Sequence, residues 1–251
     1  MNPKILAIET STEMCSIALS DGRQTRVLEE NLGQRHTERV MFIVDDILRN
    51  AALSLAELDA LAIGAGPGSF TGVRTACALA QGLALGADLP VVLVPSIEAV
   101  AHQVDATNIV VCLDARMSQV YVGFYEKRDE RCVQVGDLSV QDPDKVHLPD
   151  GSTWVGCGSG FSVYREELEM RFGDDLSSIM ASVVYPSAEA VLTIAIRKFL
   201  NGEIVSPEDA LPGRNQTGIL PEIFSLLQRK IPPPHQGFPV SVAHHFWNPS
   251  K

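Results

Sequence analysis

The glycine-rich stretch between Gly64 and Gly86 constrains the fold of this chain more than any other segment. It reads GAGPGSFTGVRTACALAQGLALG and follows an apolar run that ends at Ile63. The glycines and a proline force a tight backbone path, and Ser69 or Thr71 can cap the helical pattern that follows. The stretch therefore predicts a strand, a tight loop and a helix. Loop N–H groups beside a positive helix end suit an anion, so the loop is either an anion site or a turn without a ligand.

The predicted helix carries two stripes of small residues, each with a residue at every fourth position. The first stripe is Gly72, Ala76, Ala80 and Ala84, and the second is Ala78, Gly82 and Gly86. Small side chains let another element approach the helix closely, and one such face can lie on a sheet. The second stripe then needs a different cover, which is either a neighbouring helix or a partner chain.

Size and composition bound the class of protein. With 251 residues, 45% of them hydrophobic, the chain can bury a sizeable core, and we expect two similar lobes. A net charge of −11 opposes polyphosphates, so any role with nucleic acid is expected to be indirect. The five cysteines are odd in number and form no C-x-x-C pair, which predicts reduced and mostly buried thiols. No apolar run is long enough for a bilayer and no signal-peptide pattern is present, so we expect a cytoplasmic protein without membrane contact.

The order of predicted elements indicates a duplicated unit. A three-strand meander over residues 4–29 precedes an amphipathic helix at 36–51, and a second half opens in the same way after residue 108. ILAIE-TSTEM-CSIAL can be laid over VVCLD-ARMSQ-VYVGF with an acidic residue in the matching place. Later helices are expected at about 162–172 and at 188–200. We predict an N-terminal lobe at 1–106, a C-terminal lobe at 107–231, and a loosely ordered tail at 232–251.

Four segments together resemble one protein family. They are IETSTEMCSIALSDG, HTERVMFIVDDIL, GPGSFTGVR and DARMSQVY, and they look like the TsaB (YeaZ) family of bacterial tRNA threonylcarbamoyladenosine biosynthesis proteins. The match is specific from Met1 to about Glu126, thin from Gly156 to Leu200, and absent from the tail. The family's Pro-x-Tyr-x-Arg segment is reduced here to ALPGR, which keeps only Arg214.

The resemblance implies an α/β fold of the duplicated actin-like ATPase and sugar-kinase type (ASKHA, ribonuclease H-like), with two lobes. It also implies a non-catalytic subunit that binds the paralogue TsaD, together with the ATPase TsaE. That complex transfers a threonylcarbamoyl group from threonylcarbamoyl-AMP to N6 of the adenosine beside the tRNA anticodon. The resemblance further implies a homodimer when the chain is alone and only indirect contact with tRNA. An adenine nucleotide at the partner interface is left open.

Glu9 and Asp114 are the first candidates for chemistry within the chain itself. They end equivalent strands of the two halves, where ATPases of this superfamily hold phosphate and magnesium. Neither following turn contains the glycine that lets a backbone approach a phosphate, and Arg116 can neutralise Asp114. With Ser69, these two residues are weak candidates for cofactor binding. We expect a structural role, and a weak ATPase or small-molecule kinase remains the alternative.

Two further patterns bear on catalysis and metal binding. Gly156–Gly160 lacks the spacing of a dinucleotide loop and is expected to be a tight turn. TsaD binds its metal through a His-x-x-x-His pair, and the matching positions here are Ser96 and Val100. We therefore predict no metal site, no catalytic residue and no cofactor of the chain's own.

The helices at 36–51 and 71–85 are predicted to form the partner interface. Met41 and Phe42 lie outside the core stripe of the first helix, and the second helix has more small surface than one sheet face needs. Together they are expected to form one apolar patch, in which Ala80→Arg would block partner binding. The predicted interface residues are Val40, Met41, Phe42, Val44, Ala76, Ala80 and Leu83.

Overall fold

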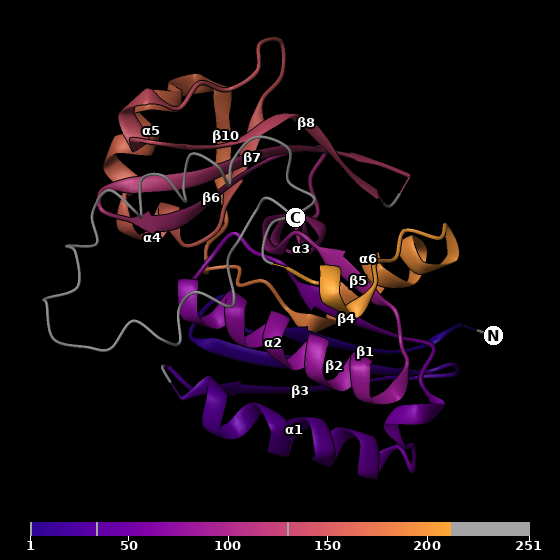
Figure 1. The fold of residues 1–251 in the computed structure, drawn as a ribbon. Helices are drawn as coiled ribbons and strands as arrows, with labels where there is room; N and C mark the ends of the chain where they lie inside the picture. Colours follow the sequence, from indigo (N-terminus) through magenta and orange to yellow (C-terminus); the bar gives the residue numbers. More distant parts are fainter. Residues whose placement is uncertain (1, 34, 130, 212–251) are drawn as a thin grey trace, which may run out of the picture. The chain divides into compact units, whose positions relative to one another are not determined.

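The computed structural model describes residues 2–33, 35–129 and 131–211, and its first sheet has five strands (Figure 1). The strands are β1 (Lys4–Glu9), β2 (Met14–Asp21), β3 (Thr25–Asn31), β4 (Ala60–Gly64) and β5 (Val91–Val94). Their order is β3-β2-β1-β4-β5. β1, β2 and β3 form the predicted antiparallel meander, whereas β4 and β5 run parallel to β1. The central strand β1 is buried along nearly its whole length, which explains its continuous apolar sequence.

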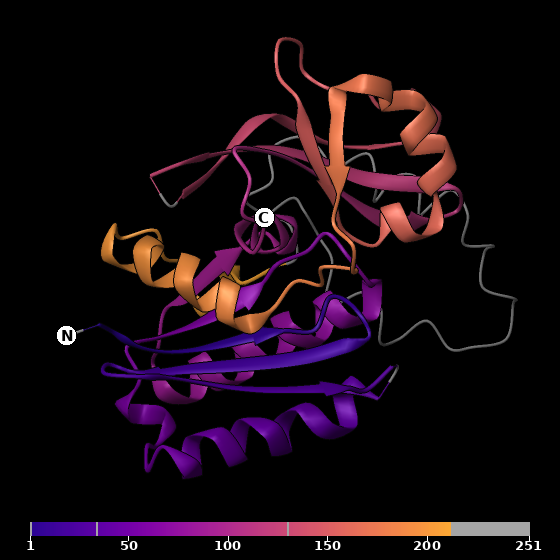
Figure 2. The same cartoon turned by 180° about the vertical axis from the view of Figure 1, so that it is seen from behind.

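Helices cover both faces of this sheet. One face packs against α1 (His36–Asn50) and α2 (Phe70–Ala87), which lie side by side in Figure 1. The opposite face packs against α3 (Ser96–His102) and α6 (Ala188–Leu200), and Figure 2 shows α6 in orange on that side. The strand, loop and helix predicted from the glycine-rich stretch correspond to β4, the following loop and α2.

The second sheet repeats the arrangement of the first. Its strands are β6 (Asn108–Arg116), β7 (Gln119–Arg128), β8 (Arg131–Gln141), β9 (Trp154–Cys157) and β10 (Leu176–Ile179). Their order is β10-β9-β6-β7-β8. Read from the other edge, β8-β7-β6-β9-β10, this is the order β3-β2-β1-β4-β5 of the first sheet with each strand number raised by five. α4 (Gly160–Val163) and α5 (Arg165–Phe172) pack on this sheet around Trp154, Phe161 and Phe172. The identical strand order confirms the predicted duplication.

Some elements differ from the expectation. The helix predicted at about 162–172 is two helices, because Tyr164 has the non-helical angles φ −123° and ψ 38°. β8 and β10 were not predicted, since both lie at sheet edges and their exposed polar residues weaken the apolar pattern. Short 3-10 helices in connecting segments span Leu55–Glu57, Pro143–Lys145, Gly173–Asp175 and Pro207–Asp209.

The chain returns to the first sheet after the second one is complete. The predicted boundaries assign α6 to the second lobe, but its buried residues Val191, Ile194 and Ala195 belong to the core on β1, β4 and β5. Val205 then pairs with Val91 at the sheet edge. The boundaries at residues 106 and 231 stay predictions, and Arg214 and the predicted tail lie outside the described residues.

The structure shows the state of the cysteines and the character of the helices. Cys15, Cys77, Cys112 and Cys157 are buried, Cys132 is half-buried, and all five are free thiols, as predicted. Within the described ranges, no helix has the length and apolar character needed to cross a membrane.

Candidate functional site

The glycine-rich loop holds a turn of the chain itself. Residues 10–12 connect β1 to β2 and lie against the start of α2. The Ser69 N–H donates to the Ser11 carbonyl oxygen at 2.6 Å, and Thr10 Oγ1 donates to the Gly72 carbonyl oxygen at 2.8 Å. Ser69 also caps α2 as predicted, because its Oγ accepts the N–H of Gly72 at 3.4 Å.

Glycine is required here because two backbones touch. A Cβ atom added at Gly68 would lie 2.5 Å from the Ser11 carbonyl oxygen, and one added at Gly72 would lie 1.9 Å from the Thr10 carbonyl oxygen. Both distances are far below van der Waals contact. The glycines therefore admit the turn at residues 10–12, in the place where a phosphate loop would admit its anion. Of the two interpretations left open by the sequence, this geometry favours a turn without a ligand.

The side chain of Glu9 is hydrogen-bonded to other residues inside the fold. Its side chain is 1% exposed and accepts hydrogen bonds from the Ser11 N–H at 2.5 Å and from Ser96 Oγ at 2.7 Å. A Cβ atom at Gly64 would lie 1.7 Å from Glu9 Oε2, so the carboxyl group fills the space above that glycine. Burial raises the pKa of Glu9, and the hydrogen bonds from Ser11 and Ser96 partly oppose that rise. Both carboxyl oxygens of Glu9 thus have hydrogen-bond partners within the chain.

Ser96 is one of the two positions at which the resemblance predicted the loss of a metal-binding histidine. It is fully buried, and its Oγ accepts the N–H of Gly66 at 3.2 Å while donating to Glu9. Ser96 therefore joins Glu9 to the glycine-rich loop. No cluster of three or more histidine, cysteine or carboxylate side chains that could bind a metal occurs among the residues described.

The burial of Glu9 predicts a dependence of stability on pH. Because its folded-state pKa lies above the ordinary value of 4.5, the folded protein holds the proton more tightly than the unfolded chain does. The stability from Glu9 is then complete below the ordinary pKa and is lost as pH rises through the folded-state pKa. Glu9→Gln removes this titration, so urea unfolding should show wild type losing stability relative to the variant from about pH 4.5 upward. A constant difference across that range would contradict the prediction.

Asp114 also has partners within its own lobe. It accepts the N–H of Arg116 at 2.8 Å and the hydroxyl of Tyr164 at 3.2 Å, and it forms the predicted ion pair with Arg116 at 3.1 Å. Its own N–H donates to Ser159 Oγ at 3.1 Å. As with Glu9, hydrogen bonds within the chain account for the conformation of this carboxylate.

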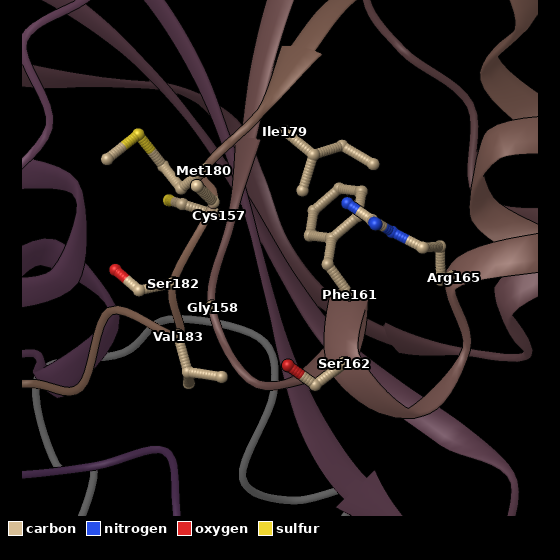
Figure 3. Close-up of a pocket in the computed structure, with 10 residues that line it drawn as sticks. Cys157, Gly158, Phe161, Ser162, Arg165, Ile179, Met180, Ser182 and Val183 are labelled. Atoms are coloured by element: carbon tan, nitrogen blue, oxygen red, sulfur yellow. The ribbon is translucent and has the colours of Figure 1, made fainter.

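The glycine cluster after β9 is a tight turn, as predicted. Cβ atoms at Gly158 and Gly160 would lie 2.5 and 2.8 Å from the Cys112 carbonyl oxygen. A pocket of about 270 Å³ lies beside this turn, and Figure 3 shows its side chains coming from the end of β9, from α4 and α5, and from the segment after β10. Its lining includes no carboxylate or histidine, and Arg165 pairs with Glu169 at 3.4 Å. Burial raises the pKa of the Cys157 thiol to about 12, so this cysteine is not a ready nucleophile.

α1 and α2 each carry exposed apolar side chains. Met41 and Phe42 of α1 are 44% and 63% exposed, and Phe70 and Leu85 of α2 are 52% and 57% exposed. The guanidinium carbon of Arg74 lies 3.4 Å from the centre of the Phe70 ring. Exposed apolar side chains that form a contiguous patch mark surfaces that bind other molecules, whereas scattered single ones are ordinary.

Part of the predicted interface is wrong, because four of its residues on α1 and α2 are buried. Val40, Val44, Ala76 and Ala80 are 0 to 3% exposed in the core beneath α1 and α2, and Leu83 is partly buried against it. These four side chains are unavailable to a partner. The exposed stripe is the second one, which carries Ala78, Gly82 and Gly86. Periodicity revealed both stripes, but a repeat of four residues does not tell which one faces the sheet.

The fold and the site together define a class of protein. The chain is a duplicated two-lobed α/β protein of the actin-like (ASKHA) type. A family model described as "TsaD: tRNA N6-adenosine threonylcarbamoyltransferase" matches residues 24–155. The TsaB protein of Escherichia coli K12, named a tRNA threonylcarbamoyladenosine biosynthesis protein, is 37% identical over 220 residues, which cover 83% of this chain and 93% of that protein.

Two further comparisons agree. TsaB of Haemophilus influenzae is 50% identical over 128 residues, 48% of this chain and 52% of that protein. The solved structure of YeaZ from Pseudomonas aeruginosa superposes with a TM-score of 0.77 at 35% identity, covering 84% of this chain and 98% of that one. The chain belongs to the TsaB (YeaZ) family.

Proposed function

We propose that this chain is a non-catalytic subunit in tRNA threonylcarbamoyladenosine biosynthesis and binds a TsaD-type partner through α1 and α2. The observation that carries the proposal is that the two adjacent helices expose large apolar side chains, namely Met41, Phe42, Phe70 and Leu85. The names of the relatives supply the pathway. The engaged carboxyl groups of Glu9 and Asp114 support an accessory role over catalysis.

Gly82 supports close contact with a partner helix. It is exposed in the middle of α2, and no described atom lies within 4 Å of a Cβ added there. A glycine in a helix interior costs about 1 kcal/mol relative to alanine, so the fold of this chain by itself gives no reason for it. A helix from another chain that crosses here would gain close backbone approach. A stable interface of this kind buries about 1,600 Å² in total.

The proposed assembly assigns the chemistry to the partner. The TsaD-type subunit transfers the threonylcarbamoyl group from threonylcarbamoyl-AMP to N6 of the adenosine beside the anticodon, and a TsaE-type ATPase takes part. This chain forms a homodimer through the same helices when the partner is absent. It works in the cytoplasm and holds no cofactor of its own, and any adenine nucleotide that it contacts would lie at the partner interface.

Reconstitution tests the proposal. The pure chain should show no robust turnover of magnesium-ATP, and threonylcarbamoyladenosine should form on tRNA only when the TsaD-type and TsaE-type proteins are added. Co-purification from native cells should recover the TsaD-type protein. The weak ATPase or kinase would replace this proposal if the pure chain had strong turnover that Glu9→Ala or Asp114→Ala abolished without unfolding the protein.

Binding of tRNA should come from the partner. The chain has 31 acidic and 20 basic residues, so its net charge opposes the phosphate backbone. We expect negligible binding of tRNA to the isolated chain at physiological salt and measurable binding once the partner is present. A filter-binding assay with each protein and with the mixture measures this, and a tight, salt-sensitive complex with the isolated chain would contradict it.

A further inference from the structure

The turn at residues 10–12 contacts the starts of both helices in the proposed interface. On one side it bonds to Ser69 and Gly72 at the start of α2. On the other side, Nε2 of His36, the first residue of α1, lies 2.8 Å from the Thr12 carbonyl oxygen. A carbonyl oxygen only accepts hydrogen bonds, so Nε2 carries the proton and donates. Three consecutive residues thus connect the N-terminal ends of the two helices.

The bond from His36 anchors an end of α1 that has no ordinary cap. Arg35 occupies the N-cap position and makes no side-chain capping hydrogen bond, whereas α2 is capped by Ser69. α1 also forms a hydrogen bond to the sheet through the exposed side chain of Arg39, which donates to Glu30 of β3. Its contacts with the core are apolar and come from Val40, Ile43, Val44 and Ile47. Apolar burial is not directional and tolerates small shifts along a helix, but a hydrogen bond fixes the distance between two atoms.

The burial of His36 indicates that the hydrogen bond to Thr12 is the reason for a polar ring at this position. The side chain is 5% exposed, and among the described atoms Nδ1 is buried without a hydrogen-bond partner. Leaving a polar atom in this state costs free energy that an apolar residue would avoid. The Nε2–H donor to Thr12 is the compensating interaction.

The second lobe uses its equivalent turn differently. In the sequence overlay, Arg116 and Met117 match Ser11 and Thr12. Arg116 and Met117 are exposed and have left-handed φ angles of 63° and 56°, whereas Ser11 is 2% exposed and Thr12 is half-buried. The duplicated unit therefore does not require a buried bridging turn. The bridge occurs in the lobe that carries α1 and α2.

We propose that His36 is a positioning residue, whose hydrogen bond to Thr12 sets α1 against α2 so that Met41 and Phe42 share one docking surface with Phe70 and Gly82. The effect on binding of a TsaD-type partner rests on the proposed function. The attachment of α1 to the turn does not, and it can be measured in the isolated chain.

The test compares His36→Ala, which removes the donor, with His36→Gln, whose side-chain amide can donate from a similar place. His147→Ala is the control, because His147 is an exposed histidine of the second lobe whose ring pairs with Arg171, away from α1 and α2. Amide hydrogen exchange over residues 37–44 and over β1 reports local opening. Titration with the TsaD-type protein reports affinity, and nitrogen NMR of the wild-type imidazole identifies the protonated nitrogen.

For His36→Ala we expect exchange in residues 37–44 to rise at least about fivefold, as for the loss of one buried hydrogen bond, with β1 unchanged and partner affinity falling by a similar factor. His36→Gln and His147→Ala should behave like wild type, and NMR should show the proton on Nε2.

A proton on Nδ1 would overturn the inference, even if His36→Ala does not fold. Unchanged exchange in a folded His36→Ala would also overturn it, as would a folded His36→Gln as impaired as His36→Ala. If exchange responds as expected but the wild type binds no partner, the proposed function fails and the attachment of α1 stands.

Discussion

Gly82→Arg is expected to abolish binding of a TsaD-type partner while the isolated chain stays folded. Gly82 is exposed, nothing lies within 4 Å of a Cβ placed there, and arginine is a good helix former. The free energy of unfolding should therefore hold or rise by up to about 1 kcal/mol. In the complex, a guanidinium group would enter an apolar contact without a counter-charge, which costs several kcal/mol, or about a hundredfold or more in affinity.

Ala80→Arg is the matched control, two residues earlier in the same helix. Ala80 is 0% exposed and part of the core beneath α1 and α2, so a buried guanidinium there should destabilise the monomer by about 4 kcal/mol or more. Circular dichroism and light scattering with the added partner distinguish the two variants. A folded Gly82→Arg that binds like wild type refutes the interface, and a folded Ala80→Arg would show that the wrong face of α2 was assigned to the core.

Gly72→Ala should be among the most destabilising single-methyl substitutions in the chain, by about 3 kcal/mol. The added Cβ would lie 1.9 Å from the Thr10 carbonyl oxygen and 3.0 Å from its carbon, and both atoms are backbone. No change of side-chain rotamer relieves that overlap. Either α2 or the turn at residues 10–12 must move, which also breaks the hydrogen bond from Thr10 Oγ1 to the Gly72 carbonyl oxygen.

Gly82→Ala provides the control for helix propensity, because it makes the same chemical change in the same helix without an overlap. It should stabilise the isolated chain by up to about 1 kcal/mol. Urea unfolding of both variants measures the difference. If Gly72→Ala were as stable as wild type, the turn would not be seated in the loop, and the anion site suggested by the glycines would be the better interpretation.

Local features of the sequence determined the main outline of the fold. The glycines after Ile63 require a tight path whatever surrounds them, and the apolar spacings of β1, α1 and α6 follow from the geometry of single elements. The repeated meander was visible because both halves open with an apolar run that ends at an acidic residue, Glu9 in the first and Asp114 in the second. The family was recognisable from motifs within the first half of the chain, and a family model and a solved relative confirm it.

Tertiary structure decided how those elements are used, because the deciding contacts join residues far apart in the chain. The bond from Thr10 to Gly72 spans 62 positions and fills the glycine-rich loop, and the bond from Ser96 to Glu9 spans 87 and engages the carboxylate. The same holds for α2, whose small stripes are equivalent in the sequence until one packs on the sheet and leaves Gly82 exposed. Helical periodicity gives the angle between two faces of a helix, but only the packed neighbours determine which face is buried.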